Sequence, residues 1–90
     1  MPHKLFRRKN NIAWRTIEGT TFLVHPSTKK IFPLNEVGNS VWLKLETAID
    51  FDTLTKNIYN EFDANFEMIK QDLNEFLESL LSEGLIERQD

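Results

Sequence analysis

The spacing of apolar residues changes once along this chain, near residue 35, from a period of two to a helical period. Before that point, three short β-prone runs are separated by turn residues: Ile12–Ile17, Thr21–His25 and Lys30–Leu34. After it, apolar residues recur every three or four positions, as one face of a helix requires. The change predicts an α+β domain in which a three-stranded antiparallel sheet precedes three helices, in the order βββααα.

Turn residues mark the predicted connections within the sheet. Gly19-Thr20 can form a two-residue turn with glycine first, and Pro26–Lys29 can form a second turn with proline at its first central position. Both turns are short enough to join neighbouring antiparallel strands.

Capping residues mark the predicted helices. Asn35, Asp50 and Asn65 are suitable N-caps, and the apolar pattern of the first helix extends to Ile49. Gly38 lies inside this first helix, where glycine costs about 1 kcal/mol relative to alanine. Its presence predicts that another element packs closely there. The third helix covers residues 66–83 and ends at a glycine.

Pro33 lies inside the third predicted strand. Because proline has no N–H, this strand is predicted at the edge of the sheet. Backbone donors alternate in direction, so Pro33 and Ile31 point the same way, and either the sheet's own ladder or an added strand loses one bond. An open edge is either protected by charge and proline or used to bind an extended peptide, and Lys29, Lys30 and Pro33 fit both alternatives.

Charge is divided unevenly along the chain. Residues 1–30 hold seven Lys/Arg and one acid, a net charge of +6, whereas residues 31–90 carry −9. The two segments could steer partners to different faces or form two solvated surfaces. In the predicted third helix, Lys70 stands alone against five acids. This disfavours contact with nucleic-acid phosphates, so a winged-helix DNA-binding protein is the less favoured alternative.

The sequence offers little from which to build a catalytic or metal site. It has no cysteine, and its two histidines, His3 and His25, have no evident carboxylate partner. A phosphate loop and a nucleophile elbow are both missing. No apolar run approaches the ~20 residues that cross a bilayer, and the start lacks a signal-peptide core. The expectation is a cytoplasmic, non-enzymatic single domain without catalytic residues, cofactor or metal.

One further pattern combines the sheet with the first helix: Trp14-Arg15, Gly19, Leu23, Pro26, Leu34-Asn35-Glu36-Val37-Gly38 and Val41-Trp42-Leu43-Lys44-Leu45. It resembles the PqqD-like family, whose hallmark is a Leu-Asn-x-x-Gly segment followed by Ile/Val-Trp and Leu. The likeness covers about residues 12–87, which we predict as a single peptide-recognition domain after a basic N-terminal segment, residues 1–11.

The resemblance implies a winged helix-turn-helix-like element that recognises the leader of a ribosomally made, post-translationally modified peptide (RiPP). The leader would bind as an added strand, antiparallel to the third strand and against the third helix. The domain would then present the precursor to a modifying enzyme or leader peptidase, with no catalysis of its own. Basic residues near the edge predict that salt weakens the binding of an acidic leader.

Two subtypes are open within this class. Trp14-Arg15 and the Asn-Glu-Val-Gly segment are similar to stand-alone partners in lasso-peptide maturation, which is the favoured subtype. The alternative is a peptide chaperone for a radical enzyme, as in pyrroloquinoline quinone synthesis. For both, the resemblance implies the same contact residues: Lys30, Ile31, Phe32, Pro33 and Leu34 on the strand, and Lys70, Leu73, Asn74, Leu77 and Leu81 on the helix. For the three leucines of the helix, core packing is an alternative explanation.

Overall fold

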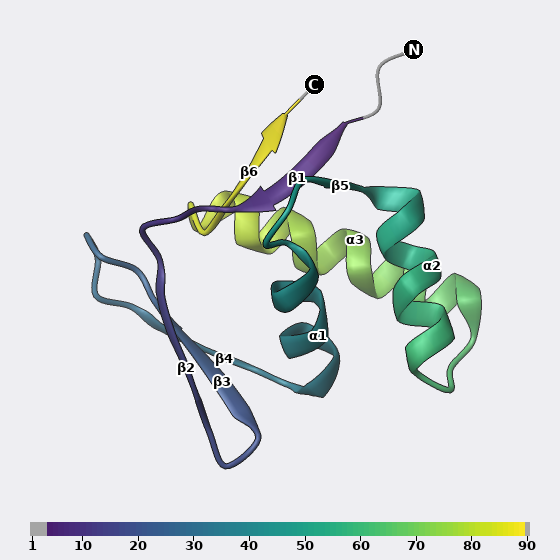
Figure 1. Cartoon of the computed structure of the whole chain (residues 1–90), viewed down its shortest axis with the longest axis horizontal. Coiled ribbons are helices and arrows are strands. Elements are labelled where there is room, and N and C mark those ends of the chain that lie inside the picture. Colours follow the sequence, from purple (N-terminus) through teal and green to yellow (C-terminus); the bar gives the residue numbers. More distant parts are fainter. Residues whose placement is uncertain (1–3, 90) are drawn as a thin grey trace.

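Two three-stranded antiparallel sheets and three helices make up residues 4–89, the part of the chain that the computed structural model describes (Figure 1). The first sheet has the order β2-β3-β4, with β2 at Ala13–Ile17, β3 at Thr20–Val24 and β4 at Ile31–Leu34. The second has the order β5-β1-β6, with β5 at Ile49–Asp50, β1 at Leu5–Arg8 and β6 at Ile86–Gln89. The helices are α1, Glu36–Lys44, α2, Phe51–Glu61, and α3, Phe66–Ser82. The predicted α+β class is confirmed.

The second sheet was not predicted from the sequence. β1 lies in the basic segment 1–11 and pairs with β6 near the other end of the described residues, so the start of β1 lies beside the end of β6 (Figure 1). Phe6 of β1 is buried and pairs with Ile49 of β5. The apolar pattern of the first helix reaches Ile49, but α1 ends at Lys44 and Ile49 belongs to β5. Of the two candidate histidines, His3 lies outside the described residues.

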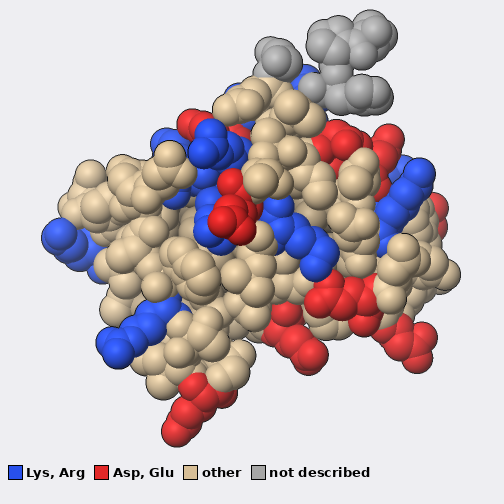
Figure 2. All heavy atoms as spheres, viewed as in Figure 1, with Lys and Arg blue, Asp and Glu red and all other residues tan. Residues whose placement is uncertain are grey.

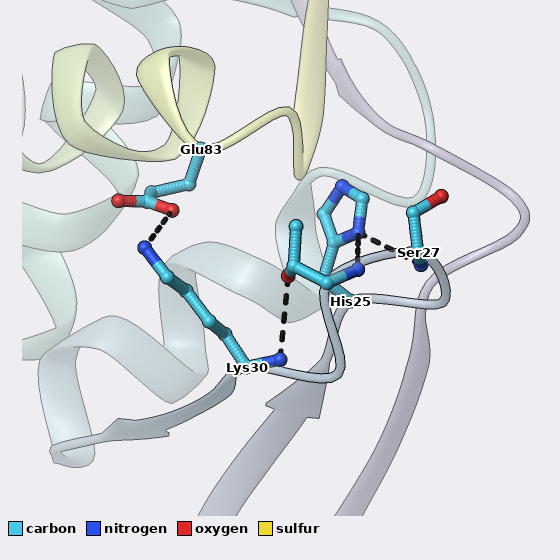
Figure 3. A network of polar contacts seen from close by, with 5 residues as sticks. His25, Ser27, Lys30 and Glu83 are labelled. Atoms are coloured by element: carbon cyan, nitrogen blue, oxygen red, sulfur yellow. Dashed lines mark hydrogen bonds and ion pairs between the residues drawn. The ribbon is translucent and has the colours of Figure 1, made fainter.

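Hairpin geometry corrects the first predicted turn by one residue. Glu18 and Gly19 have φ angles of 50° and 83°, and Thr20 already pairs with Ile17. Two positive φ angles define a turn of type I′, whose twist matches that of the flanking strands. The second turn is confirmed, and His25 stabilises it because its Nδ1 accepts a hydrogen bond from the backbone N–H of Ser27, 3.1 Å away (Figure 3).

The helices begin where the capping residues predicted. Asn35, Asp50 and Asn65 each accept a hydrogen bond from a backbone N–H in the first turn of α1, α2 and α3, respectively. Trp42 of α1 is fully buried, as are several residues of the sheet and helices packed around it, among them Leu23, Val41, Leu45 and Leu54. This core joins the inner face of the first sheet to all three helices.

Candidate functional site

β4 forms one edge of the first sheet, as Pro33 predicted. Its side chains alternate between two faces. Phe32 and Leu34 point inward and are half-buried and buried, whereas Ile31 and Pro33 are exposed. The strand therefore has one face in the protein interior and one in solvent, with an open edge between them.

Backbone bonding decides which way the polar groups of β4 point. The N–H of His25 donates to the C=O of Lys30 over 3.1 Å, and Leu23 pairs with Phe32 further along. Hydrogen-bonded and non-bonded pairs alternate in an antiparallel ladder. Lys30 and Phe32 are thus bonded to β3, whereas the backbone polar groups of Ile31 and Pro33 point away from it.

The turn between β2 and β3 leads to the same assignment independently. Ile17 and Thr20 close a two-residue turn and so form a bonded pair. Successive residues of β3 form backbone bonds to alternate sides. Thr21 therefore bonds to β4, whereas Phe22, the partner of Pro33, bonds to β2. The donor that Pro33 lacks is therefore missing from the open edge and not from the sheet's own ladder, which resolves the alternative left open by the sequence.

Helix α3 runs antiparallel to β4 along this edge. At one end, the Nζ of Lys30 lies 3.5 Å from the Oε2 of Glu83, directly after α3 (Figure 3). At the other end, Phe76 of α3 approaches the start of α1, because a Cβ atom at Gly38 would lie only 3.3 Å from the Cζ of Phe76. The close approach predicted at Gly38 is confirmed.

A cavity of about 540 Å³ opens between the end of β4, α1, the end of α2 and α3. Among residues 4–89, its lining is mainly apolar, with Asn35 and the carboxylates of Asp72 and Glu75, and includes no Lys, Arg or His. The apolar lining residues include Leu34, Val37, Phe62, Ile69, Leu73 and Phe76. We call the open edge from Lys30 to Leu34, the facing flank of α3 and this cavity the β4–α3 groove.

The predicted strand residues all belong to this groove or its rim. Lys30 lies at one end in the ion pair with α3, and Leu34 lines the cavity at the other. Phe32 packs against the core between them, Pro33 also lines the cavity, and Ile31 presents its backbone to the open edge.

The predicted helix residues divide between different surroundings. Leu73 is buried and lines the cavity. Leu77 is buried in the core and Leu81 is half-buried against it, as expected if these leucines pack in the core and do not line the groove. Lys70 and Asn74 are exposed and line a separate hollow beside the start of α2, so the structure does not bring them to β4.

The flank of α3 that does face the groove was missed. It carries Asp72, Glu75, Phe76 and, beyond the helix end, Glu83. The apolar spacing defines a buried stripe, but both flanks of such a stripe look equivalent in sequence. Gly38 indicated in sequence that another element packs against α1, but only the structure identifies Phe76 as the residue opposite.

Other polar features lie away from the groove. Ser40 and Lys44 of α1 both donate hydrogen bonds to Glu61 of α2, over 2.7 and 2.6 Å. These bonds, chiefly that from Lys44, lower the pKa of Glu61 from its ordinary value of 4.5.

On the face shown in Figure 2, acidic side chains (red) gather mainly over the helices at lower right, and basic ones (blue) lie mainly over the strands.

The described residues 4–89 contain no group of three or more His, Asp and Glu residues that could hold a metal ion. His25 uses its Nδ1 within the loop between β3 and β4. Over the same range, no helix has the length and apolar character that crossing a membrane requires.

Fold and groove together define a class: a small α+β domain whose three-stranded sheet leaves a strand edge open beside a helix and a largely apolar cavity. Residues 20–86 match the family model of coenzyme PQQ synthesis protein D, PqqD. The chain belongs to the PqqD family, which confirms the resemblance seen in the sequence.

Solved structures agree with this assignment. The structure of TbiB1 in complex with the TbiA(beta) leader peptide matches with a TM-score of 0.79 and 25% identity, over 90% of this chain and 94% of that one. The PqqD truncation of Methylobacterium extorquens PqqCD, a functional and stand-alone RiPP recognition element, matches with a TM-score of 0.75 and 18% identity. That match covers 92% of this chain and 88% of the other. A comparison with curated proteins finds no match.

Proposed function

We propose that this protein captures the leader of a ribosomally made precursor peptide as a strand added to the open edge of β4. The observation that carries this proposal is the edge itself: it keeps unpaired backbone groups at Ile31 and Pro33 beside a largely apolar cavity. Such an edge gives a peptide main-chain bonds, and neighbouring pockets select its side chains. Family membership and the likeness to TbiB1, solved with a leader peptide, support the proposal.

The edge of β4 suits this role better than the other edge of the sheet. All five residues of β2 are exposed, and none of them lines the cavity. A peptide on β2 would gain backbone bonds but little apolar burial, whereas one on β4 would bury side chains against the groove. Burial at roughly 25 cal/mol per Å² favours the second arrangement.

An antiparallel leader would make a defined set of bonds. Ile31 offers both its N–H and its C=O, and Pro33 offers only its C=O. Side chains of directly opposed residues share one face, so leader residues opposite Phe32 and Leu34 would point into the groove. The residue opposite Leu34 would lie over the cavity.

The captured leader would be passed to a modifying enzyme or leader peptidase, with this protein acting as a non-catalytic adaptor that needs no cofactor and binds no nucleic acid. We favour the lasso-peptide subtype because Trp14-Arg15 and the Asn-Glu-Val-Gly segment are similar to stand-alone lasso partners. The match to the PqqD family model favours the pyrroloquinoline quinone type as the second candidate. Neighbouring genes distinguish them: a transglutaminase-like peptidase with an asparagine-synthetase-like cyclase indicates the first, and a radical enzyme the second.

Calorimetric titration with the leader encoded beside this gene tests leader capture. We expect saturable binding by the leader and none by a scrambled peptide of the same composition. Absence of heat from the leader at high micromolar concentration would refute the proposed function.

A further inference from the structure

The two ends of the β4–α3 groove carry opposite charge. At the cavity end, Asp72 and Glu75 are exposed carboxylates, and no cationic side chain of the described residues lines the cavity with them. Neither carboxylate takes part in the two ion pairs found among residues 4–89. A peptide side chain entering this end meets an apolar wall with uncompensated negative charge at its rim.

The opposite end, where β4 begins, is cationic. Lys29 is exposed, and Lys30 is exposed despite its ion pair with Glu83. Lys9 also reaches this end, because its Nζ lies 4.0 Å from the position of a Cβ atom at Gly84. Three lysines therefore belong to this end of the groove, and only Lys30 is paired, with Glu83, in an ion pair that is solvent-exposed and individually weak.

We propose that the groove selects leaders by the order of their charges: basic residues before the strand-forming segment and acidic residues after it. This inference rests on the proposed function and deepens it. An antiparallel peptide places its N-terminal part at the end of β4, over Asp72 and Glu75, and its C-terminal part at Lys29 and Lys30. An apolar residue opposite Leu34 fills the cavity, directly after the basic residues. The sequence predicted an acidic leader, whereas the groove predicts a leader that carries basic residues first and acidic residues last.

Two synthetic peptides with blocked ends test the order directly. The first is Lys-Arg-Leu-Thr-Val-Thr-Glu-Glu, and the second, Glu-Glu-Leu-Thr-Val-Thr-Lys-Arg, has the same composition, net charge and central segment. Exposed charge pairs are individually weak, but the exchange reverses several of them at once, so we expect the first peptide to bind about tenfold more tightly at low salt. At ~1 M salt, where the screening length falls to ~3 Å, the two affinities should converge.

Paired variants of the protein locate the effect. Asp72→Asn with Glu75→Gln should reduce the preference for the first peptide, since both carboxylates line the cavity, and should leave the part that Lys29 and Lys30 contribute. Glu67→Gln with Glu78→Gln removes the same charge from α3 outside that lining and should retain the preference. Circular dichroism of both variants confirms that each is folded.

The possible outcomes separate the two proposals. Equal affinities, a preference for the second peptide, or a preference that is not reduced in the Asp72/Glu75 variant would overturn the charge order while leader capture stands. Binding of the natural leader without binding of either synthetic peptide at ~1 mM would overturn it as well. If the natural leader also fails to bind, the proposed function itself is refuted.

Discussion

Replacing Ile31 by proline tests the open edge by removing a single backbone N–H group. The backbone N–H of Ile31 points away from β3, and Pro33 has none to offer, so Ile31→Pro removes the remaining donor that β4 presents outward. The Ile31 side chain is 63% exposed, so its loss removes little from the core. We expect the free energy of unfolding to fall by less than about 1 kcal/mol, as for surface substitutions without ladder contacts.

The effect on leader binding should be much larger than the effect on the fold. A hydrogen bond contributes about 0.5–1.5 kcal/mol net, and a partner left unsatisfied costs about 1–3 kcal/mol. The leader carbonyl opposite Ile31 loses its donor, so we expect binding to weaken by about tenfold or more. Calorimetric titration with the leader measures the affinity, and urea unfolding measures the stability.

Ile31→Ala is the matched control, because it removes the side chain and keeps the N–H. We expect it to bind the leader within about threefold of the unmodified protein. The account of the edge would be wrong if Ile31→Pro bound the leader as tightly as the unmodified protein. It would also be wrong if alanine weakened binding as much as proline did.

Three other predictions follow from individual contacts. Pro33→Ala adds a donor to the open edge, so the leader should bind about two- to tenfold more tightly in calorimetry. The free energy of unfolding should fall by about 0.4–1 kcal/mol, because the unfolded chain gains conformational entropy without the proline. Unchanged affinity would contradict the assigned direction of the Pro33 backbone. Gly38→Val forces branched carbons toward Phe76, already 3.3 Å from a Cβ position, and should lower the urea-measured stability by about 1–3 kcal/mol; a stabilised variant would disprove the close approach. The lowered pKa of Glu61, caused chiefly by Lys44, stabilises the fold above pH 4.5, and this contribution is lost as the pH falls through the pKa of folded Glu61. Because the Lys44–Glu61 pair is partly exposed, we expect its loss to lower the free energy of unfolding, measured in urea, by only about 0.5 kcal/mol between pH ~6 and ~3. Glu61→Gln should lack this decrease. An equal decrease in that variant would refute the assignment.

Local chemistry explains which elements the sequence could reveal. Asn35, Asp50 and Asn65 cap helices through side chains that bond within their own first turn, so their role is visible without knowledge of the fold. Pro33 indicated an edge strand for an equally local reason, the missing N–H.

The missed features depend on partners far away in the sequence. β1 is a four-residue strand that exists because β6, at the other end of the chain, pairs with it. A strand this short shows no clear period, and its basic residues suggested a solvated segment. Likewise, the spacing of Ile69, Leu73 and Leu80 identifies a buried stripe on α3, but only the packing of α3 against α1 decides that Phe76, rather than Lys70, lies beside β4.

Amide hydrogen exchange followed by NMR tests most directly whether a leader is added to β4. In the free protein, the Ile31 amide should exchange rapidly, and the Phe32 amide should be protected by its bond to β3. Saturating leader should slow exchange at Ile31 and leave Thr16, whose amide faces the open edge of β2, unchanged. Protection that appears at Thr16 instead, or binding without any protection at Ile31, would contradict the account.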